Sequence, residues 1–191
     1  MRQSTFVKSV LCALLPIICH CNHLFDSSSP DCADKNTQST ISSGSEKVTI
    51  SQGIWGDIRY WTGDFMPKVS STQDPCSSSS GRIYNVKREV FIFPTINPFT
   101  SPSSVQLDVA GLPFILQINA TPVLTVWSDD NGFFQATLPA GSYSVLPKDT
   151  FNGKTFYYAS RYDIAGNIQT ANITTGKTAQ IILNIYFNAT H

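Results

Sequence analysis

Four side chains on one predicted strand have the residue types of a sugar-binding surface. Residues 54–61 (IWGDIRYW) alternate with the period of a β-strand, so every second side chain lies on the same face. One of these faces carries Trp55, Asp57, Arg59 and Trp61. Tryptophan rings stack on the apolar face of a sugar, and an acid and a base between them can hydrogen-bond to its hydroxyls. The alternative is that a long loop covers both tryptophans and buries them as a second small core.

The other charged clusters do not form a catalytic constellation. Lys87, Arg88 and Glu89 stand near the start of a predicted strand, where an exposed strand end explains them as well as acid-base chemistry does. The segment Asp129-Asp130-Asn131 could bind Ca²⁺ through its oxygens, but one short turn supplies too few ligands, so we expect these residues to cap the turn. The chain has no G-x-S-x-G motif and no base positioned for a serine. We expect no enzyme activity and no cofactor.

Composition excludes two further classes of function. The 191 residues have a formal net charge of +0 and are only 14% charged, with no basic cluster, so the chain lacks the lysine and arginine surface that binds nucleic acid. The three histidines lie at the two ends of the chain, at His20, His23 and His191, and no pair of soft ligands has a zinc spacing. We expect neither a nucleic-acid partner nor a metal.

The first 21 residues have the pattern of a secretory signal peptide. Arg2 and Lys8 make the start of the chain basic. Residues 10–19 (VLCALLPIIC) form an apolar run that is too short to span a bilayer and contains a proline. We therefore expect export, which places the chain in the periplasm, at the outer membrane or at the cell surface.

Cysteine positions leave the form of the mature chain open. Cys21 directly precedes the polar segment 22–45, where a bacterial lipoprotein places its lipidated cysteine, but His20 stands where that signal requires a small residue. A lipid anchor on Cys21 and plain cleavage to a soluble secreted product are both compatible with this pattern. Cys32 and Cys76 would remain after export, and an oxidising compartment permits a disulfide between them.

The rest of the chain divides into a tether and one domain. Residues 22–45 are rich in serine, threonine and aspartate and lack apolar periodicity, which predicts a solvated tether. Residues 46–191 contain short β-type runs separated by glycine and proline, and the chain has eleven of each of these two residues. We expect no helix there and about seven to nine strands, which is an all-β sandwich.

Three expectations about individual strands can be checked against the structure. Residues 46–51 should form the first strand, and residues 84–93 a single central strand that is apolar on both faces. Residues 123–147 should form three strands joined by two turns, at residues 128–132 and 139–141. The first of these turns, SDDNG, has the composition of a hairpin turn.

Several motifs together resemble a known family. They are GIWG at residues 53–56, VKREV at 86–90, SDDNGFF at 128–134 and LPAGSY at 138–143. This set is similar to the carboxypeptidase regulatory-like domain, a transthyretin-like (prealbumin-like) Greek-key sandwich, and in particular to exported Gram-negative proteins of that kind. The resemblance covers about residues 48–187. It implies a non-catalytic domain that stabilises or spaces its neighbours.

The expected function is therefore that of an exported, non-catalytic structural or interaction module. The transthyretin-like hydroxyisourate hydrolases need histidines in the sandwich, and this chain has none between His23 and His191. The alternative is a carbohydrate-binding module that uses Trp55 and Trp61. The partner is accordingly an unknown protein or a glycan, with a possible membrane attachment through the lipid anchor.

Overall fold

A computed structural model describes residues 44–66, 81–108 and 113–190 of the chain. The signal peptide, most of the tether and the cysteines Cys21, Cys32 and Cys76 lie outside these described residues. Their predicted cleavage, lipidation and disulfide therefore stay predictions. Within the described ranges, no helix is long and apolar enough to cross a membrane.

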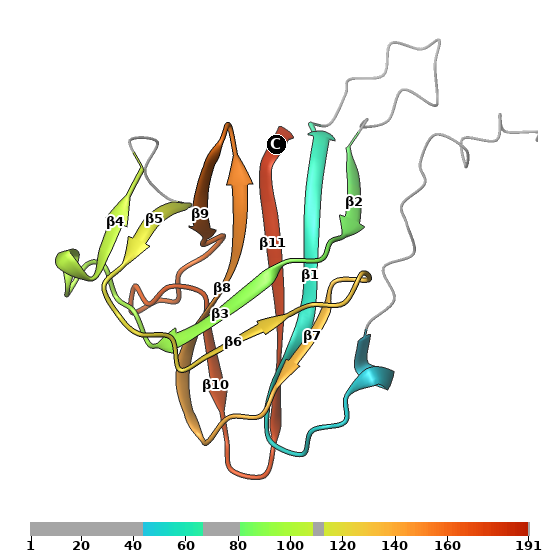
Figure 1. Cartoon of the computed structure of the whole chain (residues 1–191), viewed down its shortest axis with the longest axis vertical. Helices are drawn as coiled ribbons and strands as arrows, with labels where there is room; N and C mark the ends of the chain where they lie inside the picture. The colour runs from blue at the N-terminus through green and yellow to red at the C-terminus, as the bar shows by residue number, and fades with distance from the viewer. Residues whose placement is uncertain (1–43, 67–80, 109–112, 191) are drawn as a thin grey trace, which may run out of the picture. The chain divides into compact units, whose positions relative to one another are not determined.

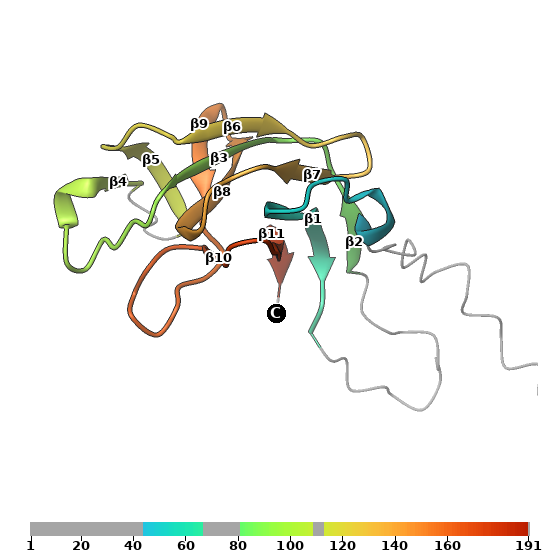
Figure 2. The same ribbon diagram turned by 90° about the horizontal axis from the view of Figure 1, so that it is seen from below.

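The described domain is a sandwich of two β-sheets, as the sequence predicts (Figure 1). The four-stranded sheet contains β1 (Gly53–Asp64), β2 (Arg82–Asn85), β7 (Phe133–Ala136) and β11 (Thr178–Thr190). The seven-stranded sheet contains β3 (Glu89–Pro94), β4 (Val105–Leu107), β5 (Phe114–Ile118), β6 (Leu124–Trp127), β8 (Gly141–Phe151), β9 (Lys154–Tyr158) and β10 (Thr170–Ile173). Two short 3-10 turns are also present, η2 (Gly44–Lys47) and η3 (Pro102–Ser104). Figure 2 shows the sheets as two layers.

Strand β1 is the centre of the four-stranded sheet. On one side it pairs in parallel with β11 over almost its whole length. On the other side it pairs antiparallel with β7 near its start and with β2 near its end. The predicted alternation holds on both long strands, because Ile54 and Ile58 of β1 and Leu183 and Ile185 of β11 are fully buried between the sheets.

The close approach of β11 explains the glycine in the middle of β1. Gly56 lies opposite Ile181 of β11. A Cβ atom at Gly56 would overlap the backbone carbonyl oxygen of Ile181, so no other residue type fits without a shift of one strand.

Strand β8 is the centre of the seven-stranded sheet and continues through Pro147. Strand β3 pairs along one side of β8, while β10 pairs with its first residues and β9 with its last ones on the other side. The amide of Val145 points to this second side, where it donates to Gln169. Pro147 has the same orientation and falls in the gap between β10 and β9, so its missing N–H interrupts no ladder.

The three predicted strands of residues 123–147 are present, but their predicted hairpin is wrong. Strand β6 pairs with β3, β7 pairs with β1, and β8 pairs with β3. The two turns therefore carry the chain from one sheet to the other and back. Turn residues specify a reversal of the chain, whereas the partner of each strand depends on residues far away in the sequence.

Two further strand predictions need correction. Residues 84–93 form the end of β2 and then β3, which belong to different sheets, and the connection is fixed by a bond from the Val86 amide to the Ile58 carbonyl. Residues 46–51 form no strand. Their polar groups instead bond to a side chain of β7, because the Thr49 amide donates to Gln135 Oε1 at 3.0 Å and Gln135 Nε2 donates to Thr49 Oγ1 at 2.8 Å.

Apolar side chains fill two clusters. The main core lies between the sheets. A second group, which we call the outer cluster, covers part of the outward face of the seven-stranded sheet. Its buried members are Phe93, Ile96, Ile115, Leu146, Ala159 and Ile168. The outer cluster does not extend to the start of β3 and the end of β6, and within the described ranges the candidate site lies there.

The packing of β1 against β11 gives a stability prediction. Gly56→Ala should lower the free energy of unfolding by about 1–3 kcal/mol, because the added methyl group forces the two strands apart. Gly153→Asn is the control: nothing lies within 4 Å of the Gly153 Cβ position, and asparagine tolerates its φ of 75°. Urea denaturation measures both changes. Equal stability of Gly56→Ala and the wild type would contradict the described register.

Candidate functional site

The predicted sugar-binding face of β1 is not an open surface. Trp55 is only 9% exposed and Asp57 only 1%. The chain ahead of β1 runs over this face: Lys47 lies over the ring of Phe133, and Gly44 packs against Phe133 and the Asp57 carboxylate. A buried indole cannot stack on a sugar, so Trp55 is not available for such stacking in the described domain.

The other two residues of that face are half-buried. Trp61 is half-buried; its Nε1 donates to Asn184 Oδ1 at 3.1 Å and its ring lies 5.0 Å from that of Phe65. Arg59 is half-buried as well, opposite Asn184 in the pairing of β1 with β11. Trp55, Asp57 and Trp61 are therefore part of the packing around β1 in the described domain.

Asp57 is an unusual group in this packing. Its Oδ2 atom is buried and has no hydrogen-bond partner in the described part of the chain. Burial raises the pKa of Asp57, while a hydrogen bond from the Gly44 amide and the charges of Arg59 and Lys47 oppose this shift. A carboxylate in this position costs stability whenever it is ionised.

Asp129 caps the turn between β6 and β7. Its Oδ1 accepts bonds of 2.9 Å from the amides of Asn131 and Phe133, and its Oδ2 forms a 2.8 Å ion pair with Lys47. Burial alone would raise the pKa of Asp129, but these three partners outweigh burial and lower its pKa. Among the residues that the structure describes, no group of three or more His, Cys, Asp or Glu side chains could hold a metal ion.

The charged residues at the start of β3 are brought together with side chains from two other strands. Arg88 Nε lies 3.0 Å from Asp149 Oδ1, and Lys87 Nζ lies 3.0 Å from Asp130 Oδ1. Glu89 lies directly opposite Trp127 of β6 on one side and Lys148 of β8 on the other. The sequence predicts an exposed strand end here, but not this meeting of three strands.

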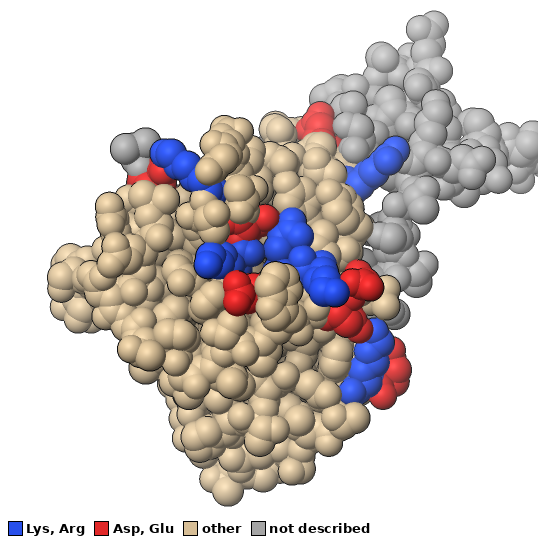
Figure 3. All heavy atoms as spheres, in the orientation of Figure 1, with Lys and Arg blue, Asp and Glu red and all other residues tan. Residues whose placement is uncertain are grey.

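These residues line a pocket of about 340 Å³, which we call the Trp127 pocket. Its lining residues are Lys87, Arg88, Glu89, Trp127, Lys148, Asp149, Thr150 and Thr155. Trp127 is 63% exposed. In Figure 3, acidic and basic side chains gather in the middle of the face formed by β3 and β6. This volume is near the lower end of the range for small-molecule sites.

One feature of the sequence indicates the exposure of Trp127. In the run VLTVW, Leu124 and Val126 share the face that packs on the main core. Trp127 therefore shares the other face with Thr125, and a polar neighbour on a strand indicates a solvent-facing side. Whether that side is covered still depends on segments elsewhere in the chain.

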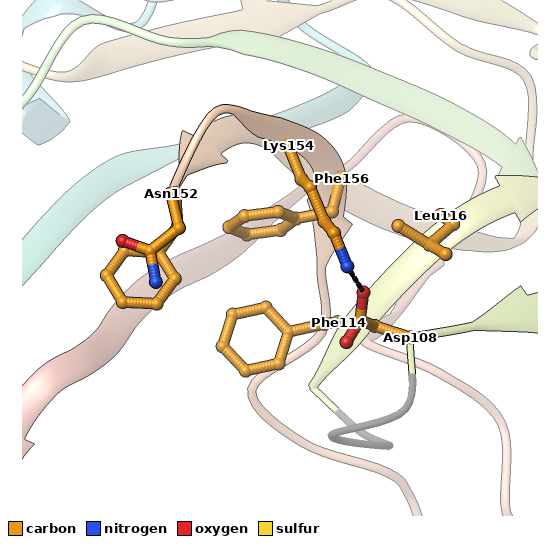
Figure 4. A pocket seen from close by; sticks show the side chains of 7 residues that line it. Asp108, Phe114, Leu116, Asn152, Lys154 and Phe156 are labelled. Atoms are coloured by element: carbon orange, nitrogen blue, oxygen red, sulfur yellow. Dashed lines mark hydrogen bonds and ion pairs between the residues drawn. The ribbon is translucent and has the colours of Figure 1, made fainter.

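A second pocket, of about 220 Å³, lies between β5 and the β8–β9 turn (Figure 4). Its walls include the rings of Phe114, Phe151 and Phe156, which also pack in the aromatic end of the main core. Its two charged groups, Lys154 and Asp108, already form a 2.9 Å ion pair. We therefore assign this pocket to packing.

Replacing Trp55 and replacing Trp127 should change stability to very different extents. Trp55→Ala should lower the free energy of unfolding by about 3–5 kcal/mol, since it empties a buried site. Trp127→Ala should change it by no more than about 0.5 kcal/mol, because the indole is largely in solvent. Thermal and urea unfolding measure both. A large loss with Trp127→Ala would show that this ring is a packing residue.

The two aspartates predict opposite pH effects. The pKa of Asp57 is higher in the native state than in the unfolded state, so the native state holds the carboxyl proton to a higher pH. The free energy of unfolding therefore falls as pH rises above 3.8, the pKa of the unfolded state. Asp57→Asn should be more stable than the wild type at neutral pH, and this difference in stability should shrink toward pH 4.

Asp129 has a lowered pKa, so Asp129→Asn should be less stable than the wild type at neutral pH. This difference in stability should shrink only as pH falls below 3.8. Denaturation curves between pH 3 and 8 test this, and a gap independent of pH for either variant would contradict it.

Comparisons with known proteins give no relative that could assign a function. No protein-family model matches the chain. No curated protein and no solved structure matches it. A function for the chain must therefore be argued from the described residues and from the motifs of the sequence.

Proposed function

We propose that the chain is an exported, non-catalytic module that binds a partner molecule in the periplasm or at the cell surface. The observation that carries this proposal is the Trp127 pocket. A tryptophan that is 63% exposed contributes little to folding, and it stands beside a carboxylate and an ammonium on an uncovered sheet face. Exposed aromatic rings among polar groups are typical of binding surfaces.

The charged groups of this pocket are arranged for binding rather than for bond cleavage. Of its five charged residues, Lys87 and Arg88 form ion pairs with Asp130 and Asp149. The buried hydroxyl of Ser128, next to Trp127 in the chain, is tied to the backbone, since its Oγ accepts a 2.8 Å bond from the Arg88 amide. A serine held in this way by an amide and without a neighbouring base is not an activated nucleophile.

The proposed export and the proposed family both rest on the sequence. The basic and apolar leader supports export, and Cys21 ahead of the polar tether supports a lipid anchor on a bacterial envelope. The motifs at residues 128–134 and 138–143 support membership of the carboxypeptidase regulatory-like group. In the structure, these motifs contain the two turns that connect the sheets.

Export is testable with the full chain in a Gram-negative host. We expect the mature protein in the envelope fraction, with its amino terminus at or near Cys21, as measured by intact-mass spectrometry. Lipidation would add the mass of acyl chains, and Cys21→Ser would then release the protein from the membrane fraction. Recovery of the chain from the cytoplasm with Met1 or Arg2 at its terminus would contradict the proposal.

A further inference from the structure

We propose that the Trp127 pocket binds a neutral pyranose sugar, with the ring stacked on Trp127 and its hydroxyls bonded to Glu89 and Lys148. This inference rests on the proposed binding function and names its ligand. It moves the glycan site from the covered face of β1 to the open face of the other sheet.

The stacking platform follows from strand register. Val90 and Ile92 of β3 and Val126 of β6 face the main core, so Glu89 and Trp127 face outward. Glu89 is directly opposite Trp127 on one neighbouring strand and Lys148 on the other. The indole, the carboxylate and the ammonium thus form one row across three strands, spaced about 5 Å per strand.

Charge pairing within the pocket favours a neutral ligand. Lys87 and Arg88 are neutralised by Asp130 and Asp149. One acid and one base remain, Glu89 and Lys148, and neither side chain forms an ion pair or a hydrogen bond with any described residue. Instead the Lys148 ammonium lies over the Phe91 ring, 5.2 Å from its centroid. An anion would meet Glu89 at close range and a cation would meet Lys148, so neither sign is favoured by the pair.

The free groups of the pocket match the hydrogen-bonding capacity of a sugar. A carboxylate accepts bonds from two adjacent hydroxyls, and an ammonium donates to hydroxyl oxygens. Thr150 and Thr155, whose hydroxyls are 3.2 Å apart, add groups that both donate and accept. Asp149, only 8% exposed, also lines the pocket, and its Oδ2 has no hydrogen-bond partner among the described residues.

Among neutral ligands, the exposed Trp127 ring favours one that has an apolar face. Trp127 presents a wide flat ring in solvent, and the C–H groups on one face of a pyranose cover such a ring well. A small polar molecule without that face would bond to Glu89 and Lys148 but leave the indole in water. The combination of one open indole with an acid and a base that form no ion pair with described residues therefore indicates a saccharide.

A direct test is titration of the full exported chain, labelled with ¹⁵N at its tryptophan indoles, with defined probes. The saccharide probes are cellotriose, maltotriose and chitotriose; the comparison probes are trilysine and pyrophosphate. Trp127→Phe identifies the Trp127 indole resonance. We expect at least one saccharide to shift this resonance with a dissociation constant of roughly 1 mM or below, as is reasonable for one shallow site.

Variants locate the site. Trp127→Ala should weaken saccharide binding at least about tenfold, and Glu89→Gln and Lys148→Met should each weaken it by about threefold or more. Phe99→Ala is the matched control, because Phe99 is an equally exposed aromatic residue (68%) that does not line the pocket. It should bind as the wild type does. Unchanged melting temperatures show that each variant is folded.

The outcomes separate the inference from the function on which it rests. If trilysine or pyrophosphate shifts the Trp127 resonance and no saccharide does, the inference of a sugar ligand is wrong. The proposed binding function would still stand. Equal loss of saccharide binding in Phe99→Ala and Trp127→Ala would place the sugar elsewhere and also overturn the inference. No shift of the Trp127 resonance with any probe would count against both the inference and the proposed function.

Discussion

The parallel pairing of β1 with β11 is the interaction on which the rest of the described domain depends. It joins strands that are more than a hundred residues apart and fixes which side chains of both strands face the core. Two short strands, β2 and β7, share the other edge of β1, so this one strand holds the whole four-stranded sheet together. Gly56 is the local requirement for that arrangement, because only a residue without a side chain lets the two backbones approach.

The same arrangement explains why one tryptophan is covered and another is open. The segment ahead of β1 must run over the outward face of the sheet before it enters the strand, and Lys47 fixes it there by its ion pair with Asp129. Trp55 is therefore part of a packed layer. On the other sheet, the outer cluster covers the end that carries Phe93 and Leu146, and among the described residues no such cluster covers the end that carries Trp127.

Charge is used sparingly in this domain, and four ion pairs join side chains of the described residues. Three of its ion pairs join a lysine to an aspartate of a turn or strand end, and the fourth, between Arg88 and Asp149, is the most buried. The desolvation of a partly buried pair of this kind offsets much of its attraction, so it adds little to the stability of the fold. Glu89 and Lys148, next to it in the Trp127 pocket, form no ion pair with any described residue.

The sequence by itself determined the all-β class, the positions of most strands and the inward faces of β1 and β11. These properties follow from residue alternation and turn residues, which are local. It did not determine the sheet that β6 and β7 join, the division of residues 84–93 between two sheets, or the passage of β8 through Pro147. The tertiary structure also decided which tryptophan is open to solvent. An outward-facing side chain such as Trp55 or Trp127 is buried or exposed according to segments distant in the chain, and residue alternation carries no information about them.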